Sequence, residues 1–270
     1  LIEINGKRIF YSGDFNFLDT RLVNGMDLTL PKTDILIMES TYAFKDHPPR
    51  PSQERKLIEI INDTCSNGGH VIVAGFAIAR LNEIMLLLHD KQIKWPVFLD
   101  GMARQATNIT LKYPYEVRDY SLLVSSCKFV KTIKKKRKAV LKQPSVVLTT
   151  SGMLDGGPVL LYLSKLYEDE TSSLVLVGFQ VEGSNGRKLL DTGKITLNGE
   201  DVEVKMRVEH LNFSAHSDNT RLYQLISRVK PKEIYVIHGD RSKEFAKELS
   251  RTLKIPSVAP SKPPYSVEVS

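Results

Sequence analysis

Between residues 52 and 191 the sequence alternates helical and strand-like patterns, and this alternation restricts the fold more than any other feature. Apolar residues at helical spacing end at Gly68-Gly69, a good helix C-cap, and a buried strand pattern follows at once. Strands joined through helices favour βαβ units and a largely parallel sheet. The expected helices are residues 52–67, 79–89 and 159–167, and the expected strands are residues 70–75, 96–101, 146–150 and 173–178.

The two ends of the chain carry another pattern, in which alternating apolar residues surround an Asn-Gly pair. The pairs and their flanking strands are Asn5-Gly6 between residues 1–4 and 7–11, and Asn198-Gly199 between residues 194–197 and 202–208. Because Asn-Gly favours the tight turn of a hairpin, we predict two β-hairpins. The remaining expected elements are strands at 33–41 and 233–237 and helices at 220–229 and 242–252. One α/β domain built from both ends and interrupted by an inserted α/β domain accounts for this order.

The net charge, the apolar runs and the cysteines indicate which partners and sites this chain is expected to have. The net charge is +7, which favours polyanionic partners through phosphate neutralisation. The basic residues concentrate in 128–142, which indicates either a nucleic-acid contact or a solvated helix face. No apolar run approaches the roughly 20 residues that span a bilayer, so we expect no membrane partner. Cys65 and Cys127 are far apart, which excludes a structural thiolate zinc site and favours a reducing compartment.

Four polar residues stand where a site is expected. Asp14, Glu39 and His238 each lie at the end of a predicted strand, and His216 lies in a polar turn before a helix. Open α/β sheets bind ligands beyond the carboxyl ends of their strands, and carboxylates with imidazoles suit zinc. Each residue also has a structural interpretation: Asp14 as a turn former or helix cap, and the histidines as hydrogen-bonded structural residues. Spacing alone does not decide between them.

Four short motifs surround these residues, at 12–15 (Ser-Gly-Asp-Phe), 39–42 (Glu-Ser-Thr-Tyr), 213–218 (Phe-Ser-Ala-His-Ser-Asp) and 237–239 (Ile-His-Gly). Their order resembles that in the β-CASP nucleases of the metallo-β-lactamase fold, and the segments 68–80, 99–103, 150–158 and 178–183 also look like signatures of that family. The chain is most similar to archaeal homologues of the endonuclease subunit of the cleavage and polyadenylation specificity factor. The resemblance implies an α/β fold with a partial metallo-β-lactamase αββα domain at 1–46 and 194–270 and an inserted β-CASP domain at 47–193.

The resemblance also implies a role for each candidate residue. Asp14 looks like the carboxylate that bridges two zinc ions, and His238 resembles a histidine ligand of one of them. His216 looks like the histidine that faces the scissile phosphate, and Glu39 like the acidic residue that orients it. Family members with histidine at the position of His238 act chiefly on RNA. We therefore expect a zinc-dependent ribonuclease of single-stranded RNA, and the motif around His216 favours internal cleavage.

The main metal-binding motif of the family, His-x-His-x-Asp-His, does not occur in this chain. The histidines are His47, His70, His89, His210, His216 and His238, and none of them has the required spacing. We therefore expect the first half of the metallo-β-lactamase domain to be missing from the sequence. Alone, the chain should bind zinc weakly and be inactive, because Asp14 and His238 cannot complete a site for two ions.

Several basic residues are candidates for guiding the RNA backbone. They are Arg80, Arg104, Arg187, Lys134, Lys135 and Lys136. The glycine-rich loops at 151–158 and 182–186 are either backbone-amide contacts to phosphate or simple turns. Further expected partners are a second copy of the chain or subunits of an RNA-processing complex. We expect a cytoplasmic location in an archaeal or bacterial cell, or a nuclear one in a eukaryote.

Two other functions compete with the nuclease. The first is a catalytically silent RNA-binding or scaffold subunit, since the resembled family contains inactive paralogues. The presence of Asp14, Glu39, His216 and His238 argues against it, because a silent subunit needs none of these groups. The second is a metallo-hydrolase of small molecules, which the large inserted domain and the positive charge disfavour.

Overall fold

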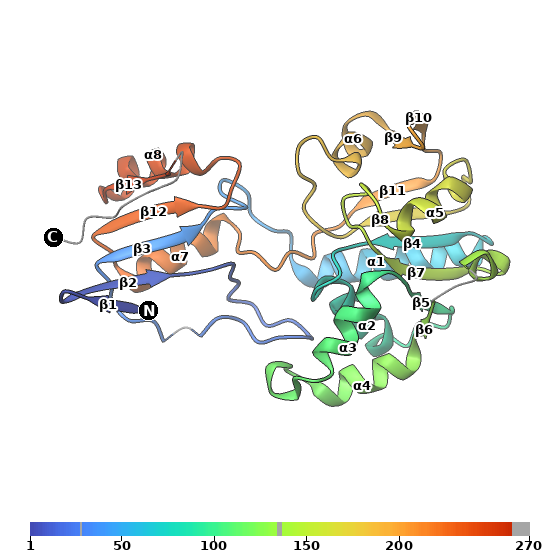
Figure 1. The fold of residues 1–270 in the computed structure, drawn as a ribbon, viewed down its shortest axis with the longest axis horizontal. Helices are drawn as coiled ribbons and strands as arrows, with labels where there is room; N and C mark the ends of the chain where they lie inside the picture. The colour runs from blue at the N-terminus through green and yellow to red at the C-terminus, as the bar shows by residue number, and fades with distance from the viewer. Residues whose placement is uncertain (28, 134–136, 261–270) are drawn as a thin grey trace. The chain divides into compact units, whose positions relative to one another are not determined.

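The computed structural model describes residues 1–27, 29–133 and 137–260, and the chain forms two compact units (Figure 1). The first unit contains residues 1–19, 25–47 and the described residues from 215 onward, and the second contains residues 20–24 and 48–214. Both ends of the chain therefore contribute to one unit, and most of the middle forms the other. In the described part of the chain, no helix combines the length and the apolar character needed to span a membrane.

The sheet of the first unit has the order β1-β2-β3-β12-β13. Its strands are β1 (Ile2–Ile4), β2 (Lys7–Tyr11), β3 (Ile35–Glu39), β12 (Glu233–Ile237) and β13 (Ser257–Val258). β1 and β2 form the antiparallel hairpin that Asn5-Gly6 predicts, and both turn residues have positive φ. The other neighbouring pairs, β2–β3, β3–β12 and β12–β13, are parallel.

Two helices cover this sheet, α7 (Asn219–Val229) and α8 (Ser242–Leu253). Leu36 and Met38 of β3 are fully buried in the same cluster as apolar residues of both helices. The rings of Tyr223 in α7 and Phe245 in α8 meet edge to face at 5.7 Å, so the two helices lie against each other. The carboxylate of Asp218 accepts a hydrogen bond from the Arg221 amide at 3.0 Å and caps α7, as its position before the helix predicts.

The second unit contains a six-stranded sheet with the order β11-β8-β4-β7-β5-β6, and all of its strand pairs are parallel. The strands are β4 (His70–Ala74), β5 (Val97–Leu99), β6 (Lys131–Thr132), β7 (Ser145–Thr149), β8 (Ser173–Leu176) and β11 (Arg207–His210). This arrangement confirms the parallel sheet predicted from the alternation of helices and strands.

The helices of the second unit are α1 (Arg50–Ser66), α2 (Arg80–Asp90), α3 (Met102–Thr110), α4 (Tyr120–Phe129), α5 (Pro158–Leu166) and α6 (Asn185–Thr192), with short 3-10 turns at η1 (Pro114–Glu116) and η2 (Arg137–Lys142). The sequence analysis assigned no helix to α3 or α4. α3 buries only Ala103 and Thr107, whereas its larger apolar residues Met102 and Ile109 are more than half exposed, so it contributes little to the core.

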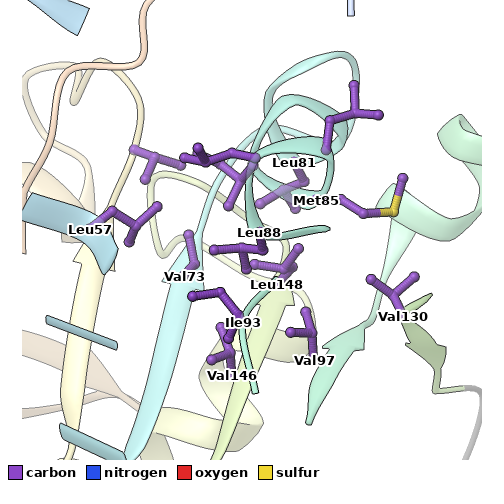
Figure 2. Packing of buried hydrophobic residues seen from close by; sticks show 14 of the residues in the cluster. Leu57, Val73, Leu81, Met85, Leu88, Ile93, Val97, Val130, Val146 and Leu148 are labelled. Atoms are coloured by element: carbon purple, nitrogen blue, oxygen red, sulfur yellow. The ribbon is translucent and has the colours of Figure 1, made fainter. Parts of the chain in front are cut away.

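Apolar side chains cover both faces of the large sheet. Val71 and Val73 of β4 belong to one cluster, whereas Ile72 and Ala74 belong to another, as expected for side chains that alternate between faces. Figure 2 shows the first cluster, in which Leu81, Met85 and Leu88 of α2 gather over the strands. A parallel sheet buried on both faces explains why its strands read as continuous apolar runs.

The segment Thr20–Asn24 belongs to the second unit, although the residues on both sides of it belong to the first. Leu22 is buried in the first cluster of the large sheet. The amides of Arg21 and Leu22 donate hydrogen bonds to the two carboxylate oxygens of Glu83 in α2, at 3.2 and 3.0 Å. Arg21 also pairs with Glu54 of α1 at 2.6 Å. Apolar burial, hydrogen bonds and an ion pair therefore attach this short segment to the second unit.

One predicted boundary differs from the structure. β9 (Lys194–Leu197) and β10 (Glu200–Glu203) form the hairpin that Asn198-Gly199 predicts, but the strand expected over 202–208 is interrupted. Its second part is β11, which pairs with β8 in the large sheet. Residues 194–214 therefore group with the second unit, whereas the sequence analysis assigned them to the domain formed by the chain ends.

Truncation of Leu88 should destabilise the protein strongly. Leu88 is fully buried in the cluster of Figure 2, so Leu88→Ala removes apolar contacts and leaves a cavity. We expect the free energy of unfolding to fall by about 2–5 kcal/mol, measured by urea unfolding with circular dichroism. Leu161→Ala is the matched control, because Leu161 is 55% exposed on α5. Equal losses for the two variants would contradict the described core.

The buried His70 should make stability depend on pH. Burial lowers the pKa of His70 below its ordinary value of 6.5, with Asp169 opposing the effect, so folding favours the neutral ring. The unfolded chain then binds more protons, and this contribution to stability is complete above pH 6.5 and declines as the pH falls through 6.5. We expect His70→Asn to show a smaller loss of stability than the unmodified chain between pH 7 and about pH 5, measured by urea unfolding. Parallel pH curves for the two proteins would refute this.

Candidate metal centre

The parallel register of the small sheet brings three of the predicted site residues to one edge. Tyr11 pairs with Ile37 and Ile237 pairs with Glu39, so β2, β3 and β12 end side by side. Glu39 is the last residue of β3, His238 directly follows β12, and Asp14 follows β2 after a short turn. The turn before α7 adds His216 to the same edge, where it contacts Glu39 and Asp14. All four residues belong to the first unit.

Asp14, His216 and His238 form a compact group of possible metal ligands. Asp14 Oδ2 lies 3.9 Å from His216 Nε2, and Asp14 Oδ1 lies 3.5 Å from His238 Nδ1. The two imidazole rings stack with centroids 5.3 Å apart. One possible ligand atom from each residue lies within 4.8 Å of the others, which no other group of histidines, cysteines and acids achieves among the described residues. The side chains of Asp14 and His238 are 62% and 57% exposed, so ligands can reach them.

Glu39 and His216 form the buried part of the cluster. His216 Nδ1 lies 2.7 Å from Glu39 Oε2, and the other oxygen of Glu39 accepts a hydrogen bond from the Phe15 amide at 3.1 Å. Burial by itself would raise the pKa of Glu39. The hydrogen bond and the charge of His216 oppose burial, as do hydrogen bonds from Thr41 and Phe15. Together these contacts lower the pKa of Glu39 below its ordinary value. An ionised carboxylate only accepts hydrogen bonds, so His216 carries a proton on Nδ1 and turns Nε2 toward Asp14.

The structure adds two residues that the sequence analysis did not select. Thr41 Oγ1 lies 3.2 Å from His216 Nδ1 and 3.1 Å from His238 Nδ1. His47 Nε2 lies 3.1 Å from the carbonyl oxygen of His216, and its ring meets Tyr42 edge to face. Thr41 could have been found from its place just beyond a strand end. No local pattern marks His47, whose contact joins residues 169 positions apart.

The backbone around His238 has little room for adjustment. His238 has a φ of +49°, which is uncommon for a residue with a side chain. Its carbonyl oxygen accepts a hydrogen bond from the Ser40 amide at 3.1 Å. The next residue, Gly239, packs so closely against Ser40 that an added Cβ would lie 2.7 Å from the Ser40 carbonyl carbon. Glycine is therefore required at position 239 for β12 and β3 to end together.

The donor atoms of this cluster fit a zinc ion. One carboxylate and two imidazoles are a common ligand set of catalytic zinc, which keeps a further position open for water or substrate. Asp14 and His238 are open to solvent, and His216 is partly exposed. Of the three residues, Asp14 and His238 could ligate an ion directly, and Glu39 fixes the orientation of His216 beside them.

The three described basic residues that were predicted to contact RNA do not belong to the unit that contains this cluster. Arg80, Arg104 and Arg187 belong to the second unit, where Arg80 is buried and Arg187 pairs with Asp191 at 2.8 Å. Lys134, Lys135 and Lys136 lie outside the described residues. The basic run does not form a single helix, because Lys128 belongs to α4 and Lys131 to β6. The glycine-rich loop at 151–158 borders a pocket of about 430 Å³ that Phe76 and Met102 also line.

Comparison with known proteins identifies the class to which this fold and cluster belong. The model of the Beta-Casp domain matches residues 81–189, and that of the Zn-dependent metallo-hydrolase RNA specificity domain matches residues 201–260. The second description associates the chain with metal-dependent hydrolases. The chain belongs to the β-CASP family of the metallo-β-lactamase superfamily.

Three similar proteins come from Methanocaldococcus jannaschii. "Probable RNase MJ4" is 39% identical over 87% of this chain and 57% of its own length. "RNase J-like protein" is 36% identical over 96% of this chain and 65% of its own length. "Transcription termination factor FttA" is 34% identical over 93% of this chain and 44% of its own length. The chain thus spans about half the length of the curated relatives that it matches.

Gly239→Ala should disturb the edge of the small sheet. The added Cβ would overlap the backbone of Ser40, so β12 or the turn at Ser40 must move. We expect a loss of about 1–3 kcal/mol in the free energy of unfolding, measured by urea titration. Gly156→Ala is the matched control, because an added Cβ there meets no atom within 4 Å. If Gly239→Ala unfolded at the same urea concentration as the control, the close approach would be refuted.

Proposed function

We propose that this chain is part of a zinc-dependent ribonuclease that hydrolyses phosphodiester bonds within single-stranded RNA. The observation that carries the proposal is the convergence of Asp14, Glu39, His216 and His238 on one sheet edge, from segments more than two hundred residues apart. The names of two relatives, "Probable RNase MJ4" and "RNase J-like protein", support the same activity.

Asp14 and His238 would hold the metal, since both are open to solvent and lie beside each other at the sheet edge. Zinc in such a site supplies a Lewis acid that polarises a phosphoryl oxygen and activates water. These two ligands alone do not complete a catalytic zinc site, which commonly takes three protein ligands. A second ion, as the resemblance implies, requires ligands in addition to these.

His216 would protonate the leaving oxygen of the RNA. Its Nδ1 is hydrogen-bonded to the buried Glu39, so Nε2 is the nitrogen that can exchange a proton with substrate. The negative charge of Glu39 stabilises the imidazolium form of the ring, which is the proton donor. His47 and Asn16 hold the backbone of His216 through hydrogen bonds to its carbonyl oxygen. The ring therefore has a fixed position from which to act.

RNA is the substrate that the charge and the comparisons favour. The net charge of +7 suits a polyanion, and the RNA specificity domain covers the segment that contains His216 and His238. Association with a second copy, or with subunits of an RNA-processing complex, stays a prediction. The same holds for a cytoplasmic location and for backbone contacts by Arg80, Arg104 and Arg187.

Replacement of His216 should abolish cleavage but preserve RNA binding. Loss of a general acid reduces the rate by about 10²–10⁴-fold. The measurement is cleavage of a labelled single-stranded RNA by the full-length protein with zinc, with binding followed by gel shift. His89→Ala is the control, because His89 lies in the second unit, hydrogen-bonded to Ser125 at 3.0 Å.

The same assay separates the nuclease from a scaffold. A silent RNA-binding subunit would bind the RNA without cutting it, and His216→Ala would then behave like the unmodified protein. Cleavage that survives equally in His216→Ala and His89→Ala would remove His216 from the chemistry.

A further inference from the structure

We propose that Thr41 is a positioning residue, whose hydroxyl holds the imidazole of His238 beside that of His216 with Nε2 of His238 free to bind a metal. The inference rests on the proposed function for its consequence in catalysis. Its structural part concerns the orientation of two rings.

The hydroxyl of Thr41 lies at the centre of the contacts between the two histidines. Its oxygen is 3.1 Å from His238 Nδ1, 3.2 Å from His216 Nδ1, and 3.2 Å from the carbonyl oxygen of His238. One small group thus touches both rings and the backbone of one of them. Because Thr41 lies just beyond the end of β3, its position is fixed by the same strand that carries Glu39.

The hydrogen-bonding capacity of these groups assigns the direction of each bond. A hydroxyl has one proton to donate and lone pairs that accept. The carbonyl oxygen of His238 and the carboxylate of Glu39 can only accept, so one of these two acceptors takes the proton of Thr41. The oxygen of Thr41 then accepts from Nδ1 of His238, and this leaves Nε2 of that ring unprotonated. Glu39 likewise accepts from Nδ1 of His216, and its negative charge also favours a second proton on that ring, which the neutral hydroxyl of Thr41 does not do for His238. Both rings thus carry the proton on Nδ1.

His238 depends on this hydrogen bond more than His216 does. The side chain of His238 is 57% exposed, whereas that of His216 is 21% exposed and is held by Glu39 at 2.7 Å. In the described part of the chain, the ring of His238 stacks on His216, and its Nδ1 lies 3.1 Å from Thr41 Oγ1 and 3.5 Å from Asp14 Oδ1. Of these contacts, Thr41 supplies the hydrogen bond that fixes the rotation of the ring.

Two substitutions test the hydroxyl of Thr41 separately from the shape of its side chain. Thr41→Val keeps the branched side chain but removes the hydroxyl, and Thr41→Ser keeps the hydroxyl but removes the methyl group. Contacts that orient a metal-binding histidine typically change metal affinity by about 10–100-fold when they are removed. In the full-length protein, we expect Thr41→Val to raise the zinc dissociation constant by about 10–100-fold and Thr41→Ser to stay within about 3-fold.

Three measurements on the full-length protein test the inference. Zinc affinity is measured by competition with a chelator, and the ring nitrogens of His238 by NMR of metal-free protein with ¹⁵N-labelled histidine, assigned with His238→Ala. RNA cleavage is then resolved into kcat and KM. We expect Thr41→Val to lose the Nδ1–H form of His238 and to lower kcat with little change in KM, and Thr41→Ser to resemble the unmodified protein.

The outcomes are distinguishable. Unchanged zinc affinity and unchanged His238 resonances in Thr41→Val would overturn the inference, as would equal losses in Thr41→Val and Thr41→Ser. If Thr41→Val does not fold, Thr41→Ala replaces it in the same comparison with Thr41→Ser. If the unmodified protein does not cut RNA but the two variants still differ in resonances and zinc affinity, the proposed function fails while the role of Thr41 stands.

Discussion

The hydrogen bond between Glu39 and His216 is the interaction on which the candidate site depends. Burial of a carboxylate is unfavourable unless charged or hydrogen-bonding partners surround it. His216 at 2.7 Å and the Phe15 amide at 3.1 Å provide these partners from two other segments of the chain. Glu39 therefore connects the end of its own strand to the loop after β2 and to the turn before α7. Without it, the ring of His216 and the Phe15 amide would each lose a charged partner at this edge.

Much of the fold follows from local patterns. Continuous apolar runs in β4, β7 and β8 indicate strands buried on both faces, and the structure places them at the centre of a parallel sheet. The Asn-Gly pairs predict both hairpins because their positive φ angles are intrinsic to those residues. These patterns depend only on neighbouring residues in the sequence, so they predict strands and hairpins without knowledge of tertiary contacts.

Tertiary contacts explain what the sequence could not show. The separation of β11 from β10 depends on pairing with β8, and the polar helix α3 has too few buried residues to mark it. The four main site residues could be selected from their motifs, but their distances depend on the register of β2, β3 and β12. Thr41 and His47 contact residues more than 160 positions away, and these contacts cannot be inferred from the local sequence.

The segment Thr20–Asn24 has a consequence for any attempt to isolate one unit of this protein. Expression of residues 48–214 alone would delete Leu22 from the core and remove Arg21, leaving Glu83 and Glu54 without their cation from this segment. Expression of the first unit with a linker in place of 48–214 would leave the apolar Leu22 in solvent. Each unit would therefore lose part of its native contacts or expose an apolar residue when it is isolated, and a shortened version of the protein should have Leu22 replaced or the Thr20–Asn24 segment supplied as a peptide.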